Sequence, residues 1–389
     1  MPSAPLAYIV GAYEHPLREA PDTSVAELHA EVTAGALADA GLAKGDVDGF
    51  FCGPDAPGTG PLSLADYMNL DLRHVDTTNT SGSSYLIHVG HALQAIAAGK
   101  CDVALITLAG RPRQQGKAKG ALSRNDNPDQ PDFQWENPFG IQILGVYGMV
   151  AQRHRHLYGT TAEQMAWVKV AASHHAQHNP HAMLRDVVSV EDVVSSPLVA
   201  DPLHRLDCCV VTDGGGALIV ARPEIAKSLK RPLVGVVGCG EAPKGQQGGY
   251  AEITETGAVR SGAAAFAQAG VAPQDIKYVS LYDSFTITAM LQIEDLGFCE
   301  KGKVGRFVED GNLISGVGRL PFNTDGGGLC NNHPVNRGGM TKAIEAVRQV
   351  RGEAHPAVQV KDCGLALANA IGGQLGVRHA SSTVILERG

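Results

Sequence analysis

The sequence predicts an α/β protein built from two similar halves. The chain has 389 residues, more than a single hydrophobic core usually organises. Its 47 glycines and its aromatic content of only 5% are common in α/β proteins, where turns are tight and helices pack closely on sheets. Short β-rich runs also alternate with alanine-rich helical segments, and this order occurs twice along the chain.

The first half begins with a strand, a helix and a second strand. The apolar run at residues 8–13 predicts the first strand, and Ser24 is placed to cap a helix over residues 24–40. A turn rich in Thr, Ser and Gly follows at residues 77–84. The other elements expected in this half are a strand at 47–52, a helix at 86–98, and strands at 103–108 and 217–220.

The second half repeats this order of strands and helices. Its expected elements are a strand at 233–238, a helix at 259–269, and strands at 278–281, 357–360 and 383–386. We therefore expect two domains, residues 1–222 and 232–389, with a loop domain of about residues 111–200 inserted in the first. Residues 111–138 predict a loop or lid, because they are dense in Gly, Gln, Asn, Asp and Pro. A merely flexible insertion is the alternative.

Composition excludes several classes of function. The net charge of −8 leaves no basic field for phosphate backbones, so nucleic-acid binding is not expected. No apolar run is long enough to span a membrane, and the start of the chain does not resemble an export signal, so we expect a cytoplasmic protein. The eight cysteines form no CxxC pair and the histidines lack a metalloprotease pattern, so no metal site is expected.

The glycine-rich stretch at residues 323–339 is the most informative part of the sequence. It contains His333 followed by proline, and a helical run begins just after it. Glycines let backbone N–H groups approach a ligand closely, and an imidazole on such a turn can polarise a carbonyl group or move a proton. A histidine that only caps its own loop is the alternative.

Four segments together resemble the thiolase superfamily, in its sterol-carrier-protein branch. They are the stretch 323–339, Leu203–Gly216, Tyr282-Asp283-Ser284-Phe285 and Leu296–Gly311. The resemblance extends over essentially the whole chain. It implies two duplicated βαβαβ-type halves in a five-layer α/β/α/β/α body with an inserted loop domain. It also implies a homodimer and acyl-coenzyme A thioester substrates, with coenzyme A as part of the substrate and no bound cofactor.

The nucleophile of that family is absent at its expected place. In thiolases a cysteine at the N-terminus of a buried helix takes the acyl group. The family's helix length places this position at Gly82, and matching the Ser-Gly motif instead would place it at Asn79; neither residue is a nucleophile. Ser83 is the substitute we consider as a catalytic residue, and we assign Ser81, Gly82 and Ser84 to substrate binding. A serine needs an adjacent base to ionise, so capping of the helix start is the alternative role for these hydroxyls.

The remaining site residues come from the other motifs. Tyr282 and Asp283 stand where the family has its second signature, and Tyr in this position resembles lipid-transfer-protein aldolases that also lack the cysteine. His333 aligns with the family's Gly-His-Pro histidine, whereas Asn332 replaces the glycine, and we assign Asn332 to substrate binding. This resemblance implies that Tyr282 acts as base or proton relay and that His333 polarises the thioester oxygen. The glycines expected to border the substrate pocket are Gly372 and Gly373.

Three functions stay open at this point. Retro-aldol cleavage of a β-hydroxyacyl-CoA needs a base and a group that stabilises the enolate, but no acyl acceptor on the enzyme. A thiolase-type acyltransferase would use a serine or a displaced thiol, for which Cys330 is the candidate because it lies three residues before His333. A non-catalytic acyl-CoA or lipid-binding protein is the third. The related aldolases also imply a small OB-fold, zinc-binding partner protein.

Overall fold

The structure is a computed structural model that describes residues 5–53, 55–114, 129, 137–139, 142–245, 252–334, 338–376 and 378–389. Most of the predicted lid at residues 111–138 therefore lies outside the described residues. The central feature is a sheet with the strand order β3-β2-β4-β7-β1-β8-β11-β10-β9. Its strands are β1 (Tyr8–Glu14), β2 (Gly49–Cys52), β3 (His74–Thr77), β4 (Val103–Gly110), β7 (Gly214–Ala221), β8 (Val234–Lys244), β9 (Tyr278–Leu281), β10 (Leu365–Gly373) and β11 (His379–Arg388).

The pairing of these strands shows the duplication. In the first half, β1 pairs antiparallel with β7, β7 antiparallel with β4, and β4 parallel with β2. In the second half, β8 pairs antiparallel with β11, β11 antiparallel with β10, and β10 parallel with β9. The two halves join into one sheet where β1 meets β8, with Tyr8 opposite Gly235. The predicted α/β fold with two duplicated halves is confirmed.

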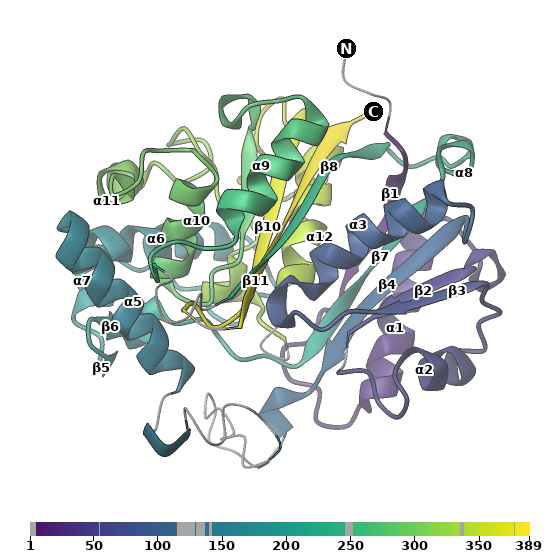
Figure 1. The fold of residues 1–389 in the computed structure, drawn as a ribbon, viewed down its shortest axis with the longest axis horizontal. Coiled ribbons are helices and arrows are strands. Elements are labelled where there is room, and N and C mark those ends of the chain that lie inside the picture. The colour runs from purple at the N-terminus through teal and green to yellow at the C-terminus, as the bar shows by residue number, and fades with distance from the viewer. Residues whose placement is uncertain are drawn as a thin grey trace.

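The helices complete five layers. They are α1 (Val25–Ala40), α2 (Pro61–Met68), α3 (Ser84–Ala97), α8 (Pro223–Ser228), α9 (Ala258–Ala269), α10 (Thr286–Asp295) and α12 (Gly339–Arg351). The helices α3 and α12 lie between the two halves of the sheet, where Val89 and Ile344 share one apolar core with strands of both halves. The helix α1 packs on the other face of the first half and α9 on the other face of the second (Figure 1).

The insertion between β4 and β7 forms a small helical layer. Its elements are α5 (Ile143–Tyr158), α6 (Ala162–Ala176), α7 (Val190–Val194), and the hairpin β5 (Leu198–Ala200) and β6 (Leu203–His204). In Figure 1 these helices gather at the left beside α10 and α11 (Val304–Val308), with which α6 shares a hydrophobic core. None of the described helices is long and apolar enough to cross a membrane.

Helix α1 begins as predicted, whereas one predicted strand is absent. Helix α1 starts where expected, because the Ser24 side chain accepts a hydrogen bond from the Glu27 amide and the Glu27 carboxylate accepts one from the Ser24 amide. The strand predicted at residues 357–360 is wrong: this segment is a turn whose residues bond to the Gln349 side chain of α12. The strand beside β9 is instead β10, which is buried along most of its length and so lacks the alternating pattern.

Candidate active site

The site lies where the N-termini of the two central helices meet. A single 3₁₀ turn, Ser81–Ser83, leads into α3, and Gly339 begins α12. A Cβ atom at Gly339 would run into the carbonyl oxygen of Gly82, so the two helix starts are in direct contact. Both helices direct the positive ends of their dipoles towards this point, which suits a site that stabilises developing negative charge.

Tyr282 and His333 meet at this point. The Tyr282 hydroxyl lies 2.9 Å from Nε2 of His333, and the two rings pack edge to face with centroids 5.3 Å apart. Both side chains are buried. Burial lowers the pKa of His333 to about 4, against the opposing charge of Asp283, so the imidazole is neutral at neutral pH. Its Nδ1 atom has no hydrogen-bond partner within the described part of the chain.

Asp283 holds the two motifs together. Its carboxylate accepts hydrogen bonds from the amides of Gly328 at 2.8 Å and Leu329 at 3.1 Å, and from Nζ of Lys342 at 2.9 Å. The side chains of Asp283 and Lys342 are at most 1% exposed. Burial disfavours the charged ammonium, but Asp283 and Asp325 outweigh it and raise the pKa of Lys342. The structure thus places Asp283 as the anchor of the His333 loop, with its acceptor positions occupied by protein donors.

Polar side chains that the sequence reasoning missed fix the turn of Tyr282. The Gln292 side chain donates a 2.6 Å hydrogen bond to the Tyr282 carbonyl, and Asn323 bonds both the amide and the carbonyl of Leu281. Gln292 and Asn323 are fully buried. A polar residue on the apolar face of the helical run predicted after residue 339 was the available signal for Lys342 in α12, whereas no helix was predicted around Gln292 of α10.

Gly82 packs directly against Tyr282. A Cβ atom at this position would lie 2.6 Å from Cε2 of the Tyr282 ring and would also run into the Ile371 carbonyl oxygen. A Cβ atom at Gly372 would run into the carbonyl oxygen of Thr80 and lie 3.0 Å from the Gly82 amide nitrogen. The tyrosine ring therefore fills the space that a side chain at position 82 would need.

The other glycine of β10 lies at the end of the strand. Gly373 has a φ of 72°, a backbone conformation that favours glycine, and a Cβ atom there would run into the Arg378 carbonyl oxygen. Gly372 and Gly373 thus allow close backbone packing at the edge of the site.

The serines at the helix start serve the local turn. Ser83 donates a 2.9 Å hydrogen bond to the Thr80 carbonyl, and Ser84 accepts one of 2.9 Å from the Thr80 amide. Ser83 and Ser84 are buried, and Ser81 takes the left-handed backbone conformation with a φ of 58°. The structure therefore brings all three to the N-terminus of α3, as the sequence predicts, but neither buried hydroxyl caps the helix: both bond to Thr80 in the preceding turn.

Two further sequence candidates point elsewhere. The Cys330 thiol accepts a 3.1 Å hydrogen bond from Nζ of Lys169 in α6, and burial raises its pKa, so it is a neutral, enclosed thiol. The Asn332 side chain donates to Glu14 at 2.8 Å and accepts from Thr212 at 2.5 Å. Both groups of its amide are thus used within the protein framework. Within the described ranges, no group of His, Cys, Asp or Glu is arranged to hold a metal ion.

Known proteins with similar sequences are thiolase-like. The family description "Thiolase C-terminal domain-like" matches residues 243–388. The chain is 32% identical to an acetyl-CoA acetyltransferase of Methanothermobacter thermautotrophicus over 384 residues, which are 94% of this chain and 96% of the relative. It is 34% identical to a steroid side-chain-cleaving aldolase of Thermomonospora curvata over 343 residues, 84% of this chain and 85% of the relative.

A solved structure is similar over the full length. The Ltp2-ChsH2(DUF35) aldolase superposes with a TM-score of 0.88 at 32% sequence identity, and the match covers 99% of each chain. Family, fold and residue-level motifs agree, and the resemblance noted in the sequence is confirmed. The chain belongs to the thiolase superfamily, in its sterol-carrier-protein-type branch.

Proposed function

We propose that the protein cleaves the Cα–Cβ bond of a β-hydroxyacyl-CoA by retro-aldol chemistry. One observation carries this proposal. The Tyr282 ring fills the space beside Gly82, the position that corresponds to the thiolase nucleophile, and its hydroxyl lies 2.9 Å from His333. The site thus has a proton-transfer pair and no room for an acyl acceptor at that position. The names of two similar proteins, a steroid side-chain-cleaving aldolase and the Ltp2-ChsH2(DUF35) aldolase, support the same reaction class.

The dyad performs the proton transfers of this reaction. Tyr282 takes the proton of the substrate β-hydroxyl and passes its own proton to Nε2 of the neutral His333. The oxygen lone pair forms the carbonyl group of a ketone or aldehyde, the Cα–Cβ bond breaks, and its electron pair moves into the thioester as an enolate. The proton then returns through Tyr282 to the α-carbon, and the shortened acyl-CoA is released.

Stabilisation of the enolate comes from the surroundings of the dyad. Because Nε2 of His333 faces Tyr282, Nδ1 is the nitrogen that remains to donate a hydrogen bond to the thioester oxygen. The N-termini of α3 and α12 add the positive ends of two helix dipoles. Proton gain at Nε2 makes the Nδ1–H a stronger donor at the moment when the enolate charge develops.

The test uses Tyr282→Phe and His333→Ala. Each should lower kcat by roughly 10²-fold or more, the usual loss for an acid–base group, while circular dichroism and thermal unfolding show an intact fold. A thermal-shift screen with acyl-CoAs, including steroid thioesters, first identifies the substrate. Wild-type turnover in both variants would refute the proposed site.

Product analysis separates the three functions. An aldolase releases a ketone or aldehyde and leaves the enzyme mass unchanged, whereas an acyltransferase accumulates a covalent acyl adduct that intact-mass spectrometry detects. A protein that only binds acyl-CoA does neither. In all cases coenzyme A arrives as part of the substrate and no resident cofactor takes part.

The proposed function includes a partner protein. The similar solved structure, the Ltp2-ChsH2(DUF35) aldolase, is named for two components. By analogy, this chain works with a small OB-fold, zinc-binding protein. Coexpression with a candidate of that type should give a complex that contains zinc and turns over faster than the isolated chain. Separate elution of the two proteins would contradict this part of the proposal.

The proposal also includes a homodimer formed through β3. This strand lies at one edge of the sheet, and Val75 on it is 39% exposed. Leu62 and Tyr67 of the neighbouring α2 are exposed as well. Pairing of two β3 edges in a two-fold arrangement would cover all three side chains. Light scattering should give a dimer mass for the wild type and a monomer mass for Val75→Lys; a monomeric wild type would contradict the proposal.

A cytoplasmic location completes the proposal. All eight cysteines are free, including the adjacent Cys208 and Cys209, which is typical of proteins in a reducing compartment. Fractionation of the source cells with an antibody against the chain would test the location, and recovery outside the cytoplasm would overturn it.

A further inference from the structure

Residues far from Tyr282 in the sequence hold the backbone of His333 in place. The His333 amide donates a 3.0 Å hydrogen bond to the Thr212 hydroxyl, and that hydroxyl donates one of 2.5 Å to the side-chain oxygen of Asn332. Thr212 is fully buried. Its hydroxyl therefore uses both its acceptor and its donor capacity, on the His333 amide and on the side chain of the residue before it.

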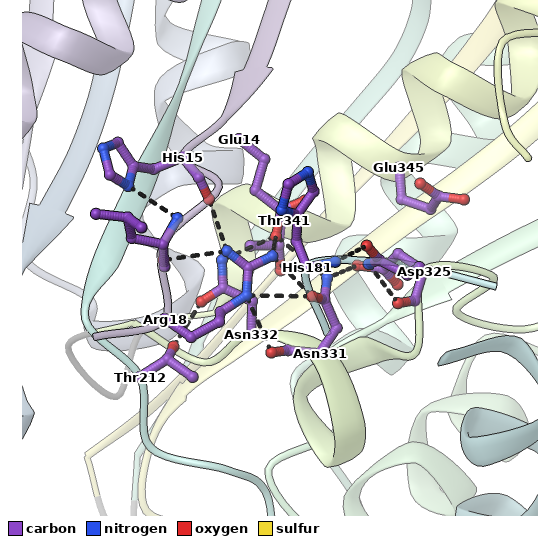
Figure 2. A network of polar contacts seen from close by, with 12 residues as sticks. Glu14, His15, Arg18, His181, Thr212, Asp325, Asn331, Asn332, Thr341 and Glu345 are labelled. Atoms are coloured by element: carbon purple, nitrogen blue, oxygen red, sulfur yellow. Dashed lines mark hydrogen bonds and ion pairs between the residues drawn. The ribbon is translucent and has the colours of Figure 1, made fainter. Parts of the chain in front are cut away.

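Glu14 holds the other end of Asn332. Its Oε1 atom accepts hydrogen bonds from the side-chain amides of Asn332 at 2.8 Å and Asn331 at 3.1 Å, and from Arg18 at 2.9 Å. Its Oε2 atom accepts from Arg348 at 3.2 Å. The Glu14 side chain is only 5% exposed, so one buried carboxylate has four donors around it. Figure 2 shows Glu14, Arg18, Asn331 and Asn332 in one connected network.

Arg18 connects this network to the main chain. Its guanidinium donates to the main-chain oxygen of Asn331 at 3.2 Å and to the side-chain oxygen of Asn331 at 2.8 Å. It also donates to the main-chain oxygen of His15 at 2.6 Å. The segment after β1 is thus tied to the π-helical turn, Gly327–Asn331, that precedes His333. Planar, bidentate contacts of this type fix orientation as well as distance.

The segment that carries Thr212 runs along the same loop. The Val210 amide donates to the Gly328 carbonyl at 2.9 Å, and Thr212 forms an isolated parallel bridge with Pro334. The Cys209 amide donates to the Ser284 carbonyl at 2.9 Å, two residues beyond Tyr282. The segment 209–212 therefore contacts both motifs of the dyad.

We propose that Thr212 and Glu14 are positioning residues that set the His333 ring against Tyr282, acting through the amide of His333 and the side chain of Asn332. This inference rests on the proposed function, because it concerns the orientation of a group in the dyad. The 2.9 Å contact between His333 and Tyr282 depends on where the backbone of His333 lies, and Thr212 is bonded directly to that backbone. A small displacement of a reacting group is enough to slow catalysis strongly.

The main variant is Thr212→Val, which keeps the shape and burial of the side chain and removes the hydroxyl. We expect kcat to fall about tenfold with little change in KM, because the geometry of the dyad and not substrate binding is affected. Thr212→Ser, which keeps the hydroxyl, should restore most of the turnover. The matched control is Thr33→Val, which removes another buried hydroxyl, one that donates to the His29 carbonyl within α1, and should leave kcat unchanged.

A double-mutant cycle separates positioning from a structural role. If Thr212 acts through His333, Thr212→Val should have almost no further effect on kcat in a His333→Ala background. A purely structural role would give the same loss in both backgrounds. Glu14→Gln should behave like Thr212→Val in this cycle, and the threonine variants keep the test valid if Glu14→Gln does not fold.

The outcomes distinguish the inference from the proposed function. Full turnover in His333→Ala alone would remove the proposed function itself. Loss of turnover in His333→Ala, combined with wild-type kcat in Thr212→Val or with additive losses in the double variant, would overturn only the positioning role. If His333→Ala has no measurable turnover, the ring proton signals of His333 in NMR spectra take the place of the cycle. They should shift in Thr212→Val and stay unchanged in Thr33→Val, and an unshifted signal in Thr212→Val would overturn the inference.

Discussion

Gly82→Ala tests the contact between the helix start and the tyrosine most directly. A Cβ atom would lie 2.6 Å from Cε2 and 2.7 Å from Cζ of Tyr282. Carbon atoms in contact prefer about 3.5–4.0 Å, so the ring must move back by about 1 Å. Gly82 is not among the glycines with positive φ, so alanine introduces no backbone strain at this position. The substitution therefore acts through packing alone.

The expected effect has two parts. Overpacking of this kind costs about 1–3 kcal/mol, which urea unfolding measures. Movement of the ring by about 1 Å also lengthens the 2.9 Å contact between Tyr282 and His333, so kcat should fall at least about tenfold in steady-state assays. Ordinary turnover together with unchanged stability would refute the placement of Tyr282 against Gly82.

A second glycine provides the matched control. Gly145 lies in α5, is exposed, and has no described atom within 4 Å of a Cβ added there. Gly145→Ala should raise the free energy of unfolding by about 0.5–1 kcal/mol, because alanine loses less backbone entropy in a helix. Its kcat should match that of the wild type. A similar loss of kcat in both variants would mean that the assay responds to alanine substitution in general.

Lys342→Met should lower the free energy of unfolding, measured with urea, by about 3–5 kcal/mol, because it leaves the buried Asp283 without its cation. Adding Asp283→Asn to this variant should restore stability. Wild-type stability in Lys342→Met would contradict a contribution of the ion pair. Burial and the charge of Asp325 raise the pKa of Glu345 from 4.5 to about 7. The contribution of this shift to folding stability is therefore complete below pH 4.5 and is lost as the pH rises through 7. Between about pH 5 and pH 8, the free energy of unfolding of Glu345→Gln should therefore fall less than that of the wild type. The same dependence on pH in both proteins would contradict the raised pKa of Glu345. Cys330→Ala should keep wild-type kcat, since the thiol is enclosed against Lys169; loss of turnover in a folded variant would favour an acyl-enzyme route.

Much of the fold follows from local patterns in the sequence. The Ser24 cap works within three residues of itself, so the start of α1 can be read from the chain directly. The strand at 278–281 has the predicted bounds, and the two helix starts rich in Gly and Ser mark the site. Tyr282 and His333 were both candidates because their motifs resemble a family, and the structure brings them into contact.

Other features could not be read from the chain because they depend on pairs of distant residues. The Tyr282 ring occupies the space beside Gly82 where thiolases have their nucleophile, and these two residues are 200 positions apart in the sequence. The anchoring of Asp283 by Lys342 and of His333 by Thr212 joins separate motifs in the same way. Continuous burial also hides the alternation of β10, so the strand was expected at the wrong segment.

There is a physical reason why some features could be predicted from the sequence and others only from the tertiary structure. Caps, turns and helix faces depend on hydrogen bonds and side chains a few residues apart, so the order of residues alone determines them. The neutral state of His333, the enclosed thiol of Cys330 and the close packing of Gly82 depend on burial and on charges that only the folded chain brings near. The sequence by itself thus determined the family and the candidate residues, and tertiary packing decided which of them face one another.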